Sequence, residues 1–445
     1  MGSGQNPIDP ARYRSAERAR AEWDRVWIKC WHAGPRVEEL PEPGDVMVHS
    51  LGGESLLFVH DQDGTIRGWF NLCRHRGNRL ILSGDGPTAV RELRCAFHGW
   101  RYGLDGALIE APYAERFGDC LADQKRTGLK SFRVEAWAGW LWFTLDDDAP
   151  PFANYLGPMR PLLEPYRLEK ATIVDYKTFE FDCNWKTVLD AFNESYHFQA
   201  LHSDILAWGN EDAPIALTGI HSMMVNEYGA PSRLYPDQAT INPALRQYLE
   251  FSGIDPDSFS GTPADVRLAG QAARRRAGED GSHLPYATLA DGQLSDAYHY
   301  LLFPSLHLNL FPEFQVAMRY RPHPSGDPLK MYFDFIMLAP LAPGEAIPSY
   351  EHRVVRGKDQ LVGEVLEWGA RRHPIAEQVL GEDIDLIEQV QAGTASIAFD
   401  GPILSEDERR IAHFHANLDR LLAGEPVAAL IADNPVEPAF GAGAA

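Results

Sequence analysis

The alternation of apolar and polar residues predicts a small β domain in the first third of the chain. From about Val37, short β-branched and aromatic runs such as DVMVHS, SLLFVHD and WLWFTL alternate with turn dipeptides such as Asp63-Gly64 and Asp105-Gly106. This pattern is typical of antiparallel strands joined by tight turns. The stretch DDDAPPFANYLGP marks the end of the domain, which we place at residues 37–157.

Residues 1–36, ahead of this domain, have a helical pattern. The run ARYRSAERARAEWDRVWIKCW carries alternating charges and a tryptophan cluster near its end. It predicts a helix. We expect this N-terminal helical segment to pack on the C-terminal domain.

Residues 158–445 show a mixed pattern that predicts an α+β domain. ATIVDYKTFEFDCNW predicts a strand, and HLNLFPEFQVAMRYRPH and LKMYFDFIMLAPL predict two long paired strands. From about Tyr350 the pattern is helical, and Ser405 and Glu408 have the spacing of a capping box. Residues 203–298 have weak periodicity, so their role is left open.

The composition restricts the class of partner. The chain has 445 residues, of which 44% are hydrophobic and 23% charged, as in an ordinary soluble globular protein of two domains. Its net charge of -22 disfavours binding to nucleic acid or to an anionic membrane. No apolar run approaches the ~20 residues that cross a bilayer, and the first residues lack the apolar core of a signal peptide, so we expect a cytoplasmic protein.

Two Cys–His pairs form the first candidate metal site, because five cysteines are too few and too scattered for a disulfide framework. Cys73 and His75 are followed, after nineteen residues, by Cys95 and His98. Two thiols and two imidazoles suit either tetrahedral zinc or a 2Fe-2S cluster with different ligands on its two irons. Gly99 in CAFHGWRYGLDG permits a close backbone approach, and the position of both pairs at turns of a β domain favours the cluster.

The second candidate site lies on a helix predicted from NWKTVLDAFNESYHFQ. On a continuous helix, Asp190, Glu194 and His197 fall within about 60° of one another. His202 lies about 140° round from His197, so the helix must tighten or end if both imidazoles are to reach one ion. Two histidines and a carboxylate on one side of a metal are the arrangement of non-haem Fe(II) enzymes.

These motifs resemble those of one enzyme family. The sequence motifs C-R-H-R-G, C-x-x-H-G-W and E-x-Y-H-x4-H are similar to those of Rieske non-haem iron oxygenases, specifically the α (large, catalytic) subunits of the ring-hydroxylating dioxygenase-like family. The resemblance implies an α+β fold, with a small all-β Rieske 2Fe-2S domain and a helix-grip (START-like) catalytic domain around a central antiparallel sheet. It is weakest over residues 203–298, which in the family contribute to the variable pocket and its lid.

The resemblance also implies a Rieske 2Fe-2S cluster and a mononuclear Fe(II), with His197 and His202 as two iron ligands. The third iron ligand in the family is an aspartate on a later helix. Asp383 in GEDIDLIEQVQAG takes this position because Glu388 and Gln391 follow at the family spacing. The alternatives for this ligand are Glu382 and Asp385. The implied cluster ligands are Cys73, His75, Cys95 and His98.

Two further carboxylates have candidate roles in catalysis. In the family, a carboxylate three residues before the first iron histidine bridges a cluster histidine of one subunit and an iron histidine of the next, and Glu194 holds this position. Most ring-hydroxylating members carry Asp there, and some members with Glu oxidise quaternary amines. The alternative for Glu194 is an ordinary helix carboxylate in a surface pair. Asp190 either supports the iron site or has a capping or structural role.

The electrons must come from a partner, because no G-x-G-x-x-G follows a strand and no flavin or nicotinamide fingerprint is present. The resemblance implies an NAD(P)H-dependent flavin reductase, with or without a ferredoxin, and a homotrimer with or without a β subunit. Six arginines and two acids lie between Cys73 and Arg101. They either steer an acidic ferredoxin or pair across the subunit contact.

We therefore expect a terminal oxygenase that uses O2 for mono- or dihydroxylation of an aromatic or otherwise hydrophobic small molecule, as in aromatic hydrocarbon catabolism. One alternative is N- or O-demethylation, including quaternary amine oxidation, for which Trp208 and Tyr228 are candidate cage residues. Another is a non-catalytic electron-transfer or ligand-binding protein. The candidate residues for the substrate pocket are Phe192, Phe198, Leu201, Leu206, His221, Met223, Met224, Leu306, His307, Asn309 and Phe314.

Overall fold

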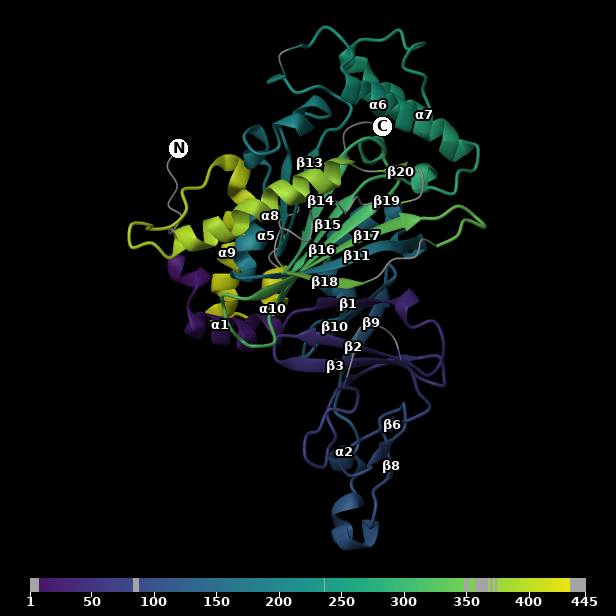
Figure 1. The fold of residues 1–445 in the computed structure, drawn as a ribbon, viewed down its shortest axis with the longest axis vertical. Coiled ribbons are helices and arrows are strands. Elements are labelled where there is room, and N and C mark those ends of the chain that lie inside the picture. Colours follow the sequence, from purple (N-terminus) through teal and green to yellow (C-terminus); the bar gives the residue numbers. More distant parts are fainter. Residues whose placement is uncertain are drawn as a thin grey trace.

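The structure is a computed structural model that describes residues 8–82, 88–235, 237–347, 352–356, 367–368, 371–372 and 374–432. The described chain contains two β-sheet bodies, a small one from the first third of the chain and a large one from the rest, with helices beside the large sheet (Figure 1). The predicted α+β class is confirmed. No helix in the described ranges is both long enough and apolar enough to span a membrane.

The small domain consists of antiparallel sheets, as the alternation of apolar residues predicts. Its seven-stranded sheet has the order β1-β10-β9-β4-β3-β2-β5. A three-stranded sheet, β6-β7-β8, lies at the tip farthest from the large sheet (Figure 1). The strands are β1 (His32–Arg36), β2 (Asp45–Leu51), β3 (Glu54–His60), β4 (Ile66–Phe70), β5 (Thr88–Ala89), β6 (Leu93–Arg94), β7 (Arg101–Tyr102), β8 (Leu108–Glu110), β9 (Ser131–Trp137) and β10 (Trp140–Thr144).

The helix predicted over residues 1–36 is shorter in the structure. α1 spans Ala16–Glu22 and continues into a single π turn at Trp23–Trp27. The chain then forms β1, which contains the poor helix formers Gly34 and Pro35 and pairs with β10 of the small sheet. α1 contacts α9 of the larger domain.

The large domain is built on an eight-stranded sheet of order β12-β13-β14-β15-β16-β17-β11-β18. All neighbouring strands in it are antiparallel except β11 and β18. The strand predicted ahead of the second metal motif is β11, and LKMYFDFIMLAPL forms β17 as predicted. HLNLFPEFQVAMRYRPH is not one long strand but the hairpin of β15 and β16, turned at Phe311–Phe314, and only β16 pairs with β17. The strands are β11 (Ala171–Phe181), β12 (Ile215–Thr218), β13 (His221–Asn226), β14 (Ala297–Leu302), β15 (Leu306–Leu310), β16 (Gln315–Pro322), β17 (Met331–Pro340) and β18 (Arg353–Arg356), with β19 (Glu367–Trp368) and β20 (Arg371–Arg372) in a separate pair.

The helix predicted from Tyr350 is wrong at β18, and also at β19 and β20, which pair with each other. The β-branched residues Val354 and Val355 of β18 pair in parallel with β11, which provides an edge for them. Residues 357–366 of that predicted helix lie outside the described residues. The later helices are present, and the backbone N–H of Ser405 donates to Glu408 Oε2 at 2.7 Å ahead of α9.

Helices cover the large sheet and place the second metal motif against it. α5 contacts β16, β17 and α8, and α9 contacts β12 and β13. α6 and α7 stand at the end of the molecule farthest from the small domain (Figure 1). The weakly periodic residues 203–298 thus form this helical lobe and also contribute strands to the sheet. The helices are α1, α2 (Gln124–Thr127), α3 (Phe152–Leu156), α4 (Met159–Leu163), α5 (Trp185–Ala191), α6 (Pro243–Phe251), α7 (Val266–Glu279), α8 (Pro374–Thr394), α9 (Arg409–Leu422) and α10 (Val427–Ala432).

A buried ion cluster ties the two domains together. Arg319 and Arg321 of β16 both donate to Asp334 of β17, each through Nε at 2.7 Å to Oδ2, and Asp334 is fully buried. Arg319 Nη1 also donates to Gly34 O at 2.6 Å, and Arg321 Nη1 donates to Ser50 O at 2.9 Å. Both carbonyls belong to the small domain, so one aspartate holds two arginines in place for the domain contact.

Candidate active site

The second metal motif begins on α5 but does not stay on it. Asn184 caps the helix, with Oδ1 accepting from Lys186 N at 3.1 Å, and the helix ends at Ala191. Asn193 N then bonds Asp190 O at 3.1 Å, three residues back. The continuous helix assumed for Asp190, Glu194 and His197 is therefore wrong. Asn and Ser residues beyond Ala191 favour turns over a continued helix.

The broken helix brings the two histidines together. His197 lies in a 3₁₀ turn (Tyr196–Gln199), and His202 immediately precedes a second one (Ser203–Ala207). Their ring centroids are 4.9 Å apart. The tightening that the sequence required between the two residues is thus made by short 3₁₀ turns.

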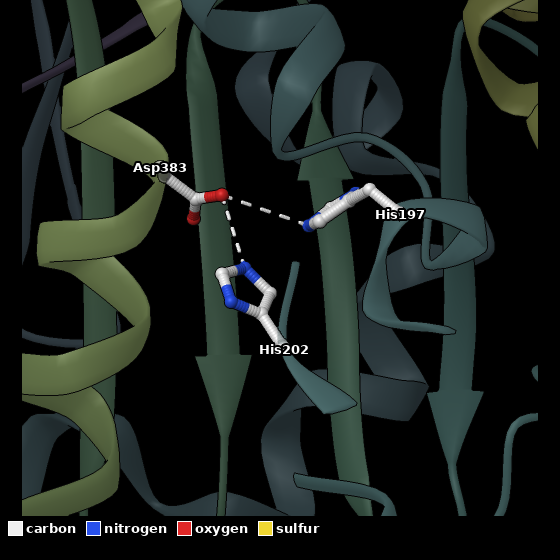
Figure 2. A group of neighbouring side chains, drawn as sticks. All are labelled: His197, His202 and Asp383. Carbon is white, nitrogen blue, oxygen red and sulfur yellow. Dashed lines mark hydrogen bonds and ion pairs between the residues drawn. The ribbon is translucent and has the colours of Figure 1, made fainter. Parts of the chain in front are cut away.

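His197, His202 and Asp383 converge on one point (Figure 2). Asp383 Oδ1 lies 3.0 Å from His202 Nε2 and 3.7 Å from His197 Nε2, and potential ligand atoms of the three residues all lie within 4.8 Å of one another. Asp383 projects from α8, whereas the histidines come from the loops after α5 (Figure 2). Two imidazole nitrogens and one carboxylate suit a mononuclear iron with open positions.

The other nitrogen of each histidine is held by a glutamate. His197 Nδ1 lies 2.5 Å from Glu194 Oε1, and His202 Nδ1 lies 2.6 Å from Glu382 Oε2. A carboxylate on Nδ1 orients the ring so that Nε2 faces the shared point, which is how proteins position metal-binding imidazoles. Glu382 therefore supports His202 and does not face the shared point, and Asp385, the other alternative ligand, is exposed.

The charge around His202 also fits a bound cation. Burial lowers the pKa of His202, but hydrogen bonds and charge interactions with Asp383 and Glu382 outweigh burial and raise it. The protein thus stabilises positive charge at this position. A metal ion would occupy the place of that proton.

Two residues that identified Asp383 in the sequence fasten α8 to the start of α5. Gln391 Oε1 accepts from Asn184 N and from Thr187 Oγ1, each at 2.8 Å. Glu388 Oε1 accepts from Asp182 N at 3.4 Å. These bonds fix the position of α8 along α5. They therefore also fix the position of Asp383.

Asp190 lies away from the three converging side chains. Its Oδ2 accepts from Tyr13 Oη at 2.7 Å and lies 2.9 Å from His415 Nε2. The contacts join the N-terminal segment, α5 and α9. Of the two roles considered for Asp190, the geometry supports the structural one.

A cavity of about 120 Å³ lies on one side of His197 and Asp383. Of the residues predicted to line a substrate pocket, Phe192, Phe198, Met224, Asn309 and Phe314 do line it. Tyr228, a candidate cage residue, lines it as well. The sequence analysis did not single out several others, although alternation along β13 from Met224 indicates Asn226. The remaining lining residues are Glu194, Ile205, Asn226, Ala297, His299, Phe311, Val316, Met318, Phe335, Val379 and Leu380.

Three strand residues predicted to line the pocket lie elsewhere. His221 is buried, with Nε2 2.8 Å from Tyr155 O and Nδ1 accepting from Phe303 N at 3.0 Å. Met223 neighbours Met224 on a strand, so the two side chains point to opposite faces. The ring of His307 is covered, with Nδ1 2.7 Å from Tyr320 Oη and Nε2 3.3 Å from an amide oxygen in the loop after α5. Leu206 and Leu306 also lie outside the lining.

A second cavity, of about 350 Å³, is also lined by these residues. Glu194, His197 and Asp383 line both cavities. Leu201, predicted for the substrate pocket, lines this second one together with the exposed apolar residues Leu386 and Val390 of α8. Two of the three converging side chains, His197 and Asp383, thus border both cavities.

The first metal motif forms two matching loops at the tip of the small domain. Gly77 N donates to Cys73 O at 2.9 Å, and Gly99 N donates to Cys95 O at 3.0 Å. Both glycines have φ near +75°, a region that L side chains avoid, so each loop depends on its glycine. The loops bring His75 and His98 to a ring separation of 4.6 Å.

The surroundings of these four residues fit a 2Fe-2S cluster. His75 Nδ1 is buried and has no hydrogen-bond partner among the described residues, as expected of a nitrogen reserved for a metal. Trp100 stacks on the His75 ring at 5.1 Å, and Tyr102 Oη lies 3.2 Å from Cys73 Sγ. Since Arg74 N donates to Tyr102 Oη at 3.0 Å, the phenol hydrogen is directed to the sulfur.

Replacing Tyr102 by Phe is expected to lower the reduction potential of the cluster by about 20–65 mV. A hydrogen bond to a sulfur ligand stabilises the reduced, more negative cluster, and such a bond is worth about 0.5–1.5 kcal/mol. A redox titration of the holoprotein measures the shift. Tyr113→Phe, at an exposed tyrosine of the same domain, is the control and should leave the potential unchanged. Equal potentials for Tyr102→Phe and the wild type would contradict the assignment.

Comparisons with known proteins agree with the two sites. The family model "Ring hydroxylating alpha subunit (catalytic domain)" matches residues 168–424, and the model "Rieske [2Fe-2S] domain" matches residues 30–133. Catalytic domains of this family hold a mononuclear iron, so the predicted family and both predicted cofactors are confirmed.

Relatives with different substrates have similar levels of identity to the chain. The glycine betaine monooxygenase oxygenase subunit of Pseudomonas aeruginosa is 28% identical over 221 residues, covering 45% of this chain and 50% of that protein. The biphenyl dioxygenase subunit alpha of Paraburkholderia xenovorans is 28% identical over 201 residues, covering 43% of each. The chain thus spans about half the length of the curated relatives it matches.

Solved structures show the same fold over almost the whole chain. A quaternary ammonium Rieske monooxygenase in complex with L-carnitine has a TM-score of 0.65 at 16% identity, covering 93% of this chain and 95% of that chain. Naphthalene 1,2-dioxygenase with indole bound has a TM-score of 0.65 at 16% identity, covering 96% of each. The chain belongs to the ring-hydroxylating α-subunit family, with a Rieske domain ahead of its catalytic domain.

Proposed function

We propose that the protein is the terminal oxygenase of a Rieske system, which uses O2 and electrons from a separate reductase to hydroxylate an aromatic or otherwise hydrophobic small molecule. The observation that carries the proposal is the cavity beside His197 and Asp383. Its lining is mainly aromatic and aliphatic, and contains no lysine or arginine among the described residues. Such a cavity suits an apolar ring.

The chain's own residues bind and orient the substrate. Phe192 and Phe198 line the cavity next to His197, so an apolar ring among them lies beside the iron ligands and is shielded from water. Glu194 and Glu382 fix the two imidazoles through Nδ1. The iron, when bound by His197, His202 and Asp383, supplies the reactivity toward O2.

We further propose that the electrons pass between subunits of a homotrimer, with or without a β subunit. The strands β6 and β8 beside the cluster loops lie in the part of the small domain that extends away from the large sheet, well separated from α8 (Figure 1). The second cavity gives an incoming cluster domain access to Glu194, and the exposed apolar Leu386 and Val390 at this cavity suit a subunit contact. A flavin reductase, with or without a ferredoxin, would reduce the cluster.

Replacing Glu194 by Gln is expected to leave both metal centres occupied but to slow electron transfer between them by about 10- to 100-fold. The amide keeps the size of the side chain but removes the charge that holds His197 Nδ1. Stopped-flow reoxidation of the reduced cluster, with substrate and O2 present, measures the rate. Metal analysis of the same sample is the control, and wild-type reoxidation with full metal content would refute the bridging role.

Oxidation of a quaternary amine is the second candidate function. Tyr228, Phe311 and Phe314 line the cavity as a group, with ring centroids 5.8 Å apart for Tyr228–Phe311 and 4.4 Å apart for Phe311–Phe314. Aromatic faces attract quaternary ammonium groups. Glu194 at the bridging position also favours this candidate. The absence of a lining lysine or arginine among the described residues disfavours a betaine, whose carboxylate would lack a partner.

A substrate screen separates the two candidates. The holoenzyme would be supplied with a surrogate reductase and NADH, and tested with naphthalene, biphenyl and indole against glycine betaine and carnitine. We expect hydroxylated products from ring compounds only. Product from a quaternary amine alone would transfer the assignment to the second candidate, and no product with both metal centres full would contradict both.

A further inference from the structure

The floor of the substrate cavity carries a row of polar side chains. Asn226, His299 and Asn309 lie on the neighbouring strands β13, β14 and β15 and all line the cavity. His299 is the direct cross-strand partner of Asn309 on one side and of Met224 on the other, and both partners line the cavity too. Direct partners in antiparallel strands project from the same face, so His299 faces the cavity.

A buried arginine fixes which nitrogen of His299 carries the hydrogen. Arg410 Nη1 lies 3.2 Å from His299 Nδ1. A guanidinium has donors only, so Nδ1 must accept, and a neutral ring then carries its hydrogen on Nε2. Burial and the charge of Arg410 outweigh a hydrogen bond of the ring with the backbone of His299 itself and hold the pKa of His299 well below its ordinary value, which keeps the ring neutral. Nε2 has no hydrogen-bond partner in another described residue and is left as a donor.

Arg410 lies fully buried behind this histidine without an ion pair to any described carboxylate. Its Nε donates to Ser222 Oγ at 3.0 Å, and its Nη2 has no partner in the described chain. Burial lowers the pKa of Arg410 to about 9, so the group stays charged at neutral pH. Glu194 interacts electrostatically with this charge but forms no ion pair with it in the described chain. The buried positive charge strengthens the Nε2–H donor in front of it and disfavours a cation on the cavity floor.

The two asparagines leave unused polar atoms on either side. Oδ1 of Asn226 and Oδ1 of Asn309 are buried, with no hydrogen-bond partner among the residues described. An amide can present either its oxygen or its nitrogen, so these residues accept a donor or an acceptor. Only His299 has a fixed direction, and it offers a donor.

We infer that His299 is a specificity-determining residue, which donates a hydrogen bond from Nε2 to a ring substrate that carries a neutral acceptor, such as a ring nitrogen or an ether or carbonyl oxygen. The inference rests on the proposed function, because it takes this cavity as the substrate site. The acceptor lies on the sheet floor, and the apolar part of the molecule lies between Phe192 and Phe198, beside His197.

Naphthalene and quinoline test the inference, because they match in shape and differ by one ring nitrogen. The dissociation constants of both ligands would be measured by equilibrium dialysis with resting holoenzyme, for the wild type and for His299→Phe. The difference in hydration between the ligands is the same for both proteins, so it cancels when the ratio of the two constants is compared between the variant and the wild type. We expect quinoline binding to weaken by about 3- to 10-fold relative to naphthalene binding in the variant. This factor corresponds to the free energy of one neutral hydrogen bond.

Three further variants keep the test decisive. His299→Gln places an amide N–H near the position of Nε2 and should restore the preference for quinoline. Arg410→Gln removes the group that fixes the tautomer and should reduce the preference, and it serves if His299→Phe does not fold. His307→Phe removes an equally buried imidazole whose ring centroid is 4.5 Å from that of His299 and which does not line the cavity, so its ratio should equal that of the wild type.

An unchanged ratio in the folded His299→Phe or Arg410→Gln variant, or an equal change in His307→Phe, would overturn the inference. Turnover with a surrogate reductase separates this result from a failure of the proposed function. Product formation with an unchanged ratio contradicts only the role of His299. A ratio that changes as expected, without product from any ring compound, upholds the binding role of His299 and contradicts only the proposed oxygenation.

Discussion

Replacing Asp383 by Ala is expected to remove the mononuclear iron and to reduce oxygenation to below about 1% of the wild-type rate, while the Rieske cluster stays intact. Asp383 is buried and, among the described residues, supplies the one carboxylate that faces both His197 and His202. Without it, two imidazoles remain, which hold Fe(II) weakly. The visible spectrum reports the cluster, and iron analysis reports the loss of the third iron.

Asp385→Ala is the matched control for this experiment. Asp385 lies two residues further along α8, is exposed, and was an alternative ligand on sequence grounds. We expect this variant to keep its iron and its activity. Loss of iron in Asp385→Ala together with retention in Asp383→Ala would show that the ligand is assigned to the wrong residue.

Asp334→Ala is expected to destabilise the protein by about 3–5 kcal/mol, the usual effect of removing one member of a buried ion cluster. The change would leave Arg319 and Arg321 buried without their shared carboxylate. It would also release the arginine bonds to Gly34 O and Ser50 O at the domain contact. Urea unfolding, followed by tryptophan fluorescence and by cluster absorbance, measures the loss.

Asp147→Ala is the control for the effect of removing a carboxylate as such. Asp147 is exposed in the acidic stretch between the domains, so we expect a change within about 0.5 kcal/mol. A loss below about 1 kcal/mol in Asp334→Ala would contradict the structural role of the cluster.

The same cluster predicts a pH dependence. Burial raises the pKa of Asp334, but Arg321 and Arg319 outweigh burial and hold it far below its ordinary value. A carboxyl with a depressed folded-state pKa contributes stability above its unfolded pKa of about 3.9, and this contribution is lost as the pH falls further. Between neutral pH and about pH 4 the contribution is constant. Below that range the stability difference between the wild type and Asp334→Asn should shrink, and a constant difference would contradict the ionised state of Asp334.

The candidate metal ligands could be singled out in the sequence because each is part of a short motif. Cys73 and His75, or His197 and His202, are close in the chain, so local spacing carries most of the geometry. Asp383 is distant, and its choice over Glu382 depended on the spacing to Glu388 and Gln391. The structure gives that spacing a physical basis, since the two later residues fasten α8 to α5.

The path of the chain around the iron site could not be predicted from periodicity. The stripe of Asp190, Glu194 and His197 fits a helix, yet the helix ends at Ala191 and the chain continues in 3₁₀ turns. Helical periodicity describes a surface pattern and does not register where Asn and Ser end a helix. The strand at Arg353–Arg356 was missed for a related reason, because its partner β11 is far away in the sequence.

The pocket was predicted only in part because its floor is a sheet. Met223 and Met224 were both assigned to the lining, although neighbouring strand residues face opposite sides. His299 has no motif of its own, and its significance depends on Arg410 of α9, which is remote in sequence and adjacent in space. Contacts of this kind follow from the strand register and the packing of α9, which the sequence pattern did not specify.

Quantitative analysis of iron and acid-labile sulfide in anaerobically purified protein tests the central claim most directly. A Rieske cluster together with a mononuclear iron predicts about three irons and about two sulfides per chain. One zinc per chain without acid-labile sulfide would contradict it.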